Sequence, residues 1–88
     1  MKAIDRISIY LEFKMITPHK FEHTLHISNG YFNKQLRNKG SIGSDILIKV
    51  SENYDDLNML WILTGEGFML KYPAKIIEIF ESKKNNIY

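Results

Sequence analysis

The chain has 88 residues, a formal net charge of +2 and no cysteine. This length fits one domain, and the lack of cysteine excludes disulfides and cysteine-ligated zinc while fitting a reducing cytoplasm. No apolar run approaches the roughly 18 residues that span a bilayer. Charged residues interrupt the apolar start of the chain, which is therefore interpreted as mature sequence and not as a signal peptide. We expect a cytoplasmic protein without a membrane partner.

The first predicted element is a helix over residues 3–14. Ile4, Ile7 and Leu11 follow the i, i+3, i+7 spacing of an amphipathic helix. Charged side chains are expected on its other side. An apolar share of 44% supplies enough side chains for a folded core, so this helix is expected to pack and not to remain disordered.

Two further helices follow closely. Thr17 is expected to cap the second helix, with Pro18 at its first position and Leu25 near its end. After a tight connection, Ser28 is expected to cap a third helix over residues 29–38. A glycine-containing stretch ends that helix.

The rest of the domain is also predicted to be helical. Ser44 is expected to cap a fourth helix, and Asn58 a fifth helix over residues 59–63, which a glycine ends. Residues 68–70 are apolar enough for a short extended piece but lack a partner strand. The sequence therefore predicts an all-α fold of five short helices.

A sixth helical segment begins at Pro73. Ile76, Ile77 and Phe80 form one apolar stripe there, which fits packing either on the domain or on a second copy of the chain. We hypothesise that it helps to form a symmetric homodimer. The expected organisation is a domain over residues 1–72 and a C-terminal helix and tail over residues 73–88.

The second and third predicted helices have the spacing of a helix-turn-helix, with about eight residues, a connection of about three and then about ten. In the third helix, Phe32 and Leu36 are expected to face the core. A polar face lies opposite, formed by Gly30, Tyr31, Lys34, Arg37 and Asn38. Between residues 28 and 44 the chain holds three basic residues and no acid, so the local field is expected to be positive.

This polar face has the chemistry of a nucleic-acid reader. Gly30 removes bulk where the helix would approach a partner. Asn29 can both donate and accept hydrogen bonds, as an adenine edge requires. Free N–H groups at the helix start suit a phosphate, and Lys34 supplies charge one turn later.

The segments FEHTLHISNGYFNKQLRNKGSIGSDILIKV and YDDLNMLWILTGEGFML resemble the λ-repressor-like helix-turn-helix family, also called the xenobiotic-response-element family. They are most similar to the small phage-repressor-type regulators of Bacteroidetes. The resemblance covers about three-quarters of the chain. It implies a five-helix fold, sequence-specific binding of double-stranded DNA by the third helix, and transcriptional repression by a dimer.

The resemblance also implies which residues contact DNA. Ser28, Asn29, Gly30, Tyr31 and Lys34 match the family's DNA-facing positions. The family's backbone-contacting positions fall on Thr17, His19, Ser41 and Ser44.

The chain departs from the family pattern in two places. His26 stands where the family has a turn glycine, so this residue is expected to adopt a left-handed backbone. The peptidase-like domain that many relatives carry is not expected here.

Other functions fit the sequence less well. His19, Glu22 and His23 spell a zinc-peptidase motif, but the third metal ligand and the substrate cleft are missing, and such short motifs often arise by chance. We expect no enzyme activity, no metal, no cofactor and no small-molecule substrate. The alternative from another class is a protein-interaction or antitoxin-like module with the same fold but no specific DNA binding.

Overall fold

The computed structural model describes residues 1–71, and these residues form five α-helices and no β-strand. The helices are α1 (Ala3–Phe13), α2 (Pro18–Leu25), α3 (Tyr31–Asn38), α4 (Ser44–Asn53) and α5 (Met59–Thr64). The predicted all-α class is confirmed. The helix predicted from Pro73, with its apolar stripe and its role in a dimer, lies outside the described residues.

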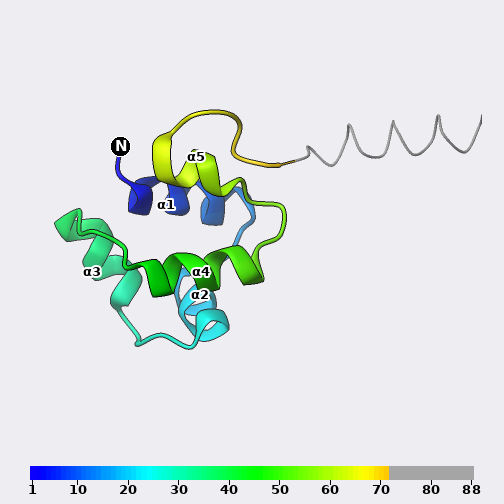
Figure 1. Cartoon of the computed structure of the whole chain (residues 1–88). Coiled ribbons are helices and arrows are strands. Elements are labelled where there is room, and N and C mark those ends of the chain that lie inside the picture. Colours follow the sequence, from blue (N-terminus) through cyan, green and yellow to red (C-terminus); the bar gives the residue numbers. More distant parts are fainter. Residues whose placement is uncertain (72–88) are drawn as a thin grey trace, which may run out of the picture.

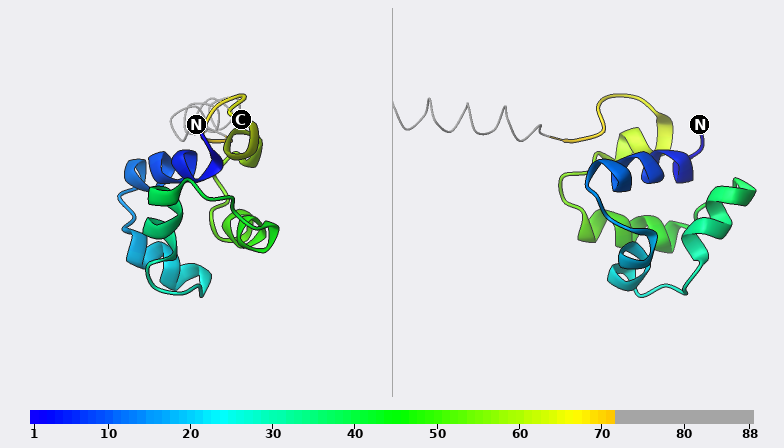
Figure 2. Two further views of the ribbon diagram at one scale, coloured as in Figure 1. Left: turned by 90° about the vertical axis from the view of Figure 1, so that its left-hand side faces the viewer. Right: turned by 180° about the vertical axis from the view of Figure 1, so that it is seen from behind.

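The helices surround one core. Helices α1 and α5 lie side by side at the top of the molecule, and α2 and α4 lie beneath them (Figures 1 and 2). Helix α3 forms one edge, where it packs against α1 and α2, while α4 packs against α2. The helix that is expected to read DNA therefore lies at one edge of the domain.

Phe21 stands near the centre of an aromatic cluster that joins α2 to its neighbours. Its ring centroid lies 5.7 Å from that of Phe32 in an edge-on arrangement and 6.1 Å from that of Tyr54 in a stacked one. Edge-on and offset pairs of this kind are favourable beyond their buried area. The core comprises Ile4, Ile7, Tyr10, Leu11, Phe21, Leu25, Phe32, Ile46, Val50, Leu57 and Ile62.

The prediction that Phe32 is buried is confirmed, because only 3% of its surface is exposed. The same prediction for Leu36 is wrong in degree. Leu36 is only half-buried, because it lies at an open groove between α1 and α3.

Two of the four predicted helix caps are confirmed. The Thr17 side chain accepts a hydrogen bond from the Lys20 amide, and the Asn58 side chain accepts one from the Leu60 amide. The predicted cap at Ser44 is wrong, because α4 begins at Ser44 itself, and Gly43 occupies the cap position without a side-chain bond.

The start of α3 also differs from the prediction. Ser28 is not the cap, because the chain turns through residues 28–30 and the helix begins at Tyr31. Gly30 adopts a φ of 87°, which L side chains rarely allow, so the glycine is needed to make this turn. Asn29 and Gly30 therefore lie in a turn that leads into the helix.

Residues 68–70 do have a partner, contrary to the prediction. Leu70 forms an isolated antiparallel bridge with Leu57, and the Asn58 amide donates to the Met69 carbonyl at 2.8 Å. This single bridge holds the segment after α5 against the segment before it.

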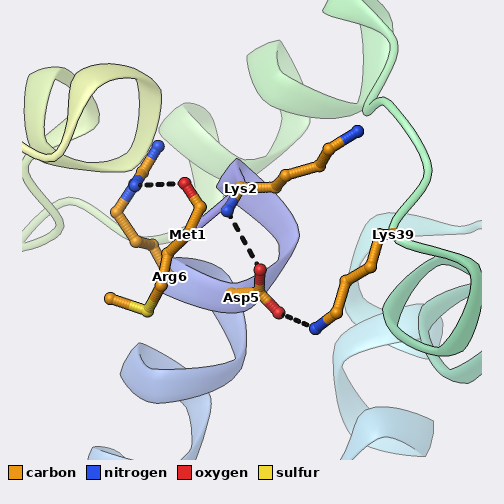
Figure 3. Close-up of polar contacts among 5 residues, drawn as sticks. All are labelled: Met1, Lys2, Asp5, Arg6 and Lys39. Carbon is orange, nitrogen blue, oxygen red and sulfur yellow. Dashed lines mark hydrogen bonds and ion pairs between the residues drawn. The ribbon is translucent and has the colours of Figure 1, made fainter.

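Arg6 departs from the expectation that charged residues of the first helix face water. It is buried, and its Nε donates to the Ile62 carbonyl at 2.7 Å while its Nη1 donates to the Met1 carbonyl at 2.8 Å (Figure 3 shows the bond to Met1). A cation near the last carbonyls of α5 also interacts favourably with the helix dipole. Arg6 thereby joins α1 to the end of α5.

Candidate nucleic-acid interface

The predicted site residues lie in α2, α3 and the segments that flank α3. All except Tyr31 are exposed: Thr17, His19, Ser28, Asn29, Gly30, Lys34, Arg37, Asn38, Ser41 and Ser44. The turn before α3, α3 itself and the start of α4 follow one another along one edge of the molecule (Figure 1). These ten residues therefore supply exposed hydroxyl, amide and cationic groups along one continuous stretch of backbone and at the start of α2.

The start of α2 and helix α3 share a groove with α1. Pro18 and Asn33 line the same open groove of about 320 Å³, with Phe32 and Leu36 at its floor. Thr17, the cap of α2, precedes Pro18 directly. Thr17 therefore lies next to a residue that shares this groove with Asn33, in the first turn of α3.

His26 confirms the expected turn geometry. Its φ and ψ of 56° and 45° are left-handed, and it ends α2 with its amide bonded to the last turn. The Ile27 amide then bonds back to the Glu22 carbonyl at 3.0 Å. These bonds turn the chain sharply from α2 towards α3, at the cost of backbone strain at a residue that is not glycine.

The N-terminal end of α3 is held by a buried carboxylate. Glu22, with only 3% of its surface exposed, accepts a hydrogen bond from the Phe32 amide at 2.9 Å through its Oε2. The Tyr31 amide bonds to the Ser28 carbonyl. The expectation of a free helix start for a phosphate is therefore wrong for these two amides, because Glu22 and Ser28 already use them.

The C-terminal end of α3 is held by an ion pair. Lys39, which follows the helix in a left-handed conformation, reaches across to the Asp5 carboxylate in α1 (Figure 3). The hydrogen bond from Lys39, and a second from the Lys2 amide, hold the pKa of Asp5 below its ordinary value. One of the three basic residues in the acid-free stretch is thus engaged within the protein.

The other two basic residues, Lys34 and Arg37, are exposed and have no ion-pair partner among residues 1–71. Their charge is available to an anionic ligand. Asp45 is the first acidic residue after the acid-free stretch, and its negative charge adds to the effect of burial in raising the pKa of Tyr31. The positive field is therefore centred on the middle and end of α3.

Tyr31 is the one predicted contact residue that does not project into solvent. It is half-buried and packs against the core, and burial raises the pKa of its phenol. The helical-wheel placement on the outer face was wrong because α3 begins at Tyr31, where the chain still lies close to the domain. Tyr31 thus packs the first turn of α3 against the core.

Sequence reasoning missed Asn33, which is exposed in the first turn of α3 and lies at the rim of the groove. Only the observed start of α3 at Tyr31 shows that Asn33, three residues after Gly30, lies in the first turn of the helix. The roles of Glu22 and Asp5 were also missed, because both act across the fold and carry no local signal.

The zinc-peptidase motif does not assemble. His19 and His23 are exposed, whereas Glu22 points inward to the Phe32 amide. Within residues 1–71 no group of three metal-ligating side chains comes together. Nor is any helix in this part of the chain long and apolar enough to cross a membrane.

Comparison of the chain with protein-family models, with curated proteins and with solved structures finds no match.

Proposed function

We propose that the protein is a sequence-specific regulator that binds double-stranded DNA, with α2 and α3 acting as a λ-repressor-like helix-turn-helix and α3 lying in the major groove. The observation that carries this proposal is the exposed, acid-free turn and helix over residues 28–38, fixed to the domain at both ends. Glu22 holds its beginning and Asp5 holds the lysine that follows its end. Such rigid placement is what base recognition requires.

The exposed groups divide into those that would contact base edges and those that would contact the DNA backbone. The major groove is about 12 Å wide and admits an α-helix, and an asparagine amide can form two bonds to an adenine edge. Asn29, in the turn that leads into α3, is the proposed base reader. Lys34 and Arg37, farther along the helix, meet guanine edges or phosphates.

Four other predicted residues contact the DNA backbone in this proposal. Thr17 and His19 lie at the start of α2, Ser41 in the loop after α3 and Ser44 at the first position of α4. Contacts from hydroxyl groups and helix starts to phosphates fix the register of a protein on DNA but do not themselves read sequence.

We further propose that the protein acts in the cytoplasm as a repressor and binds as a homodimer. Dimeric regulators with a helix-turn-helix contact two half-sites about 34–36 Å apart, one helical turn of DNA. A repressor needs only to occupy such an operator, so it requires neither an enzyme activity nor a cofactor.

A second candidate function is a protein-interaction module. It is favoured by the exposed apolar side chains Ile9 and Phe13 on α1 and Leu60 and Leu63 on α5, which a protein partner could cover. These side chains and the basic turn and α3 lie on different elements, so a DNA-binding test separates the two candidates.

Selection of bound duplexes from a random library tests the proposed function. The full chain is expected to enrich one short motif, and Asn29→Ala is expected to lose preference at one base pair, by roughly 1–3 kcal/mol. Asn53→Ala, an exposed asparagine at the end of α4, is the matched control and is expected to select the wild-type motif. Enrichment of no motif by the folded protein would favour the protein-interaction module.

A further inference from the structure

A second open pocket lies between the start of α1, the end of α5, the first turn of α4 and the loop that joins α3 to α4. Its volume of about 340 Å³ is at the lower end of the range for small-molecule sites. Two cations, Lys2 and Arg6, line it, and no acidic side chain of the described residues does. The pocket shares no lining residue with the groove beside α3.

Arg6 brings a positive charge to the wall of this pocket from a buried position, because only 8% of its surface is exposed. Its guanidinium donates to the carbonyls of Met1, Ile62 and Leu63 at 2.8, 2.7 and 3.4 Å. These carbonyls carry no net charge, and the end of α5 supplies only about half a negative elementary charge. Within residues 1–71, no carboxylate forms an ion pair with Arg6. A buried charge without a counter-ion is costly, so an anion in the pocket would be favoured.

Lys2 supplies a second positive charge to the same pocket. Its backbone amide donates to Asp5, but its side-chain ammonium has no ion-pair partner in the described part of the chain. Figure 3 shows this side chain extending away from Asp5, whose carboxylate contacts Lys39 instead. The Lys2 ammonium is therefore available to a ligand.

The rest of the lining is largely aliphatic. Ile42 from the loop, Leu47 from α4 and Leu63 from α5 contribute to it. Leu63 is 54% exposed, so much of its side chain contacts water when the pocket is empty. An inorganic ion would leave these side chains uncovered, whereas an apolar group on the ligand would bury them. The lining therefore matches a molecule with an anionic part and an apolar part.

From the unneutralised cations and the aliphatic wall together, we propose that this pocket binds a small organic anion, a carboxylate that carries an apolar group. The carboxylate lies beside Lys2 and Arg6, and the apolar group lies against Leu63. A ligand of about ten non-hydrogen atoms is expected to bind such an open site with a dissociation constant of about 1 mM. The site does not require the proposed DNA binding, although Ser41 belongs to both surfaces.

NMR titrations of the full ¹⁵N-labelled chain test this proposal. The probes are hexanoate and 4-phenylbutanoate, added at constant pH and ionic strength. Both are expected to shift the amides of Ala3, Ser41, Ile42 and Leu63 along saturable curves and to leave those of α2 in place. Hexanamide has the same apolar chain without the charge, and acetate has the charge without the chain. Each of these two controls is expected to bind at least about fivefold more weakly than hexanoate.

Two matched pairs of variants locate the binding. Lys2→Gln removes a cation of the pocket, whereas Lys20→Gln removes an exposed lysine on α2. Leu63→Ser and Leu60→Ser change two side chains of α5 that are equally exposed, at 54%, but only Leu63 lines the pocket. Lys2→Gln and Leu63→Ser are expected to weaken hexanoate binding by about two- to fivefold, and the other two variants to bind as the parent does.

Several results would overturn the proposal. The absence of a saturable shift with both probes would show that the pocket binds no such anion. Equal binding of hexanoate and hexanamide would show that the two cations are not used, and equal binding of hexanoate and acetate would show that the aliphatic wall is not. Equal weakening by Lys2→Gln and Lys20→Gln would place the binding elsewhere on the protein.

Discussion

Helices α1 and α3 are attached to the domain in different ways. Helix α1 buries Ile4, Ile7, Tyr10 and Leu11, so apolar packing along its whole length holds it. Helix α3 buries only Phe32 and depends on polar contacts at its two ends. A helix attached in this way leaves most of its surface to a partner, but single substitutions at its few attachment points displace it.

The largest expected effect concerns the apolar attachment of α3. Phe32→Ala is expected to destabilise the protein by about 3–5 kcal/mol, the usual cost of truncating a large buried aromatic residue. In a domain this small, that loss largely unfolds it. Leu36→Ala, at a half-buried position of the same helix, is expected to cost less than half as much, as measured by urea unfolding. Equal losses of stability in the two variants would contradict the structure, in which Phe32 is buried and Leu36 is only half-buried.

The buried carboxylate gives the next largest effect. Glu22→Ala leaves the Phe32 amide without its partner and is expected to cost about 1–3 kcal/mol. Glu22→Gln keeps an acceptor in place and is expected to recover most of this loss. Thermal unfolding of the two variants makes the comparison, and a glutamine variant as unstable as the alanine variant would show that the hydrogen bond is not what matters.

The left-handed turn predicts a stabilising substitution. His26→Gly is expected to raise stability by up to about 1 kcal/mol, because glycine relieves the strain at this φ and loses only part of that gain through its greater freedom in the unfolded chain. His23→Gly, inside α2, is the control and is expected to destabilise by about 1 kcal/mol. A destabilised His26→Gly protein would contradict the turn geometry.

The smallest effect is a dependence on acid pH. Burial acts to raise the pKa of Asp56, but hydrogen bonds from Lys14 and Tyr10 outweigh it, so the pKa is lowered from the ordinary 3.8. Asp5 is lowered by Lys39. The stability that these two carboxylates contribute is therefore present above about pH 3.8 and is lost as pH falls through their lower folded values.

Melting temperatures between pH 6 and pH 2 check this dependence. The Asp5→Asn, Asp56→Asn double variant is expected to show a shallower fall than wild type. Glu52→Gln, on the exposed side of α4, is the control and is expected to follow the wild-type curve. A double variant with an unchanged curve would show that other groups govern the acid transition.

Local signals made much of the fold predictable. Thr17 and Asn58 mark their helix starts with side chains that bond within the same turn, and Gly65 ends α5 in a left-handed conformation. Ser28 misled the prediction because its type suits a cap. The bond that serves the start of α3 comes instead from Glu22 in α2, ten residues before the amide that it accepts from.

The site was less predictable than the fold because its geometry depends on contacts across the domain. The sequence shows that Lys34, Arg37 and Lys39 are basic, but only the fold assigns Lys39 to Asp5 and leaves the other two exposed. Likewise, Arg6 resembles a surface residue until α5 places its carbonyls beside it. The predicted site residues other than Tyr31 are exposed as expected, whereas the tertiary partners of Lys39 and Arg6 were not predicted.

The salt dependence of DNA binding tests most directly the claim that α3 is the helix that contacts DNA. The slope counts phosphate contacts, and variants on different sides of the molecule show where those contacts are made. Binding of the selected operator by wild type, Lys34→Ala and Lys71→Ala is measured at several salt concentrations. Lys34 lies on α3, and Lys71 is an exposed lysine beside α1 and α5.

If Lys34 contacts a phosphate, Lys34→Ala is expected to weaken binding on all sequences and to reduce the slope of log K against log salt by about 0.9. Lys71→Ala is expected to match wild type. If the two folded variants change binding equally, or if wild type binds no duplex, α3 is not the DNA-reading helix.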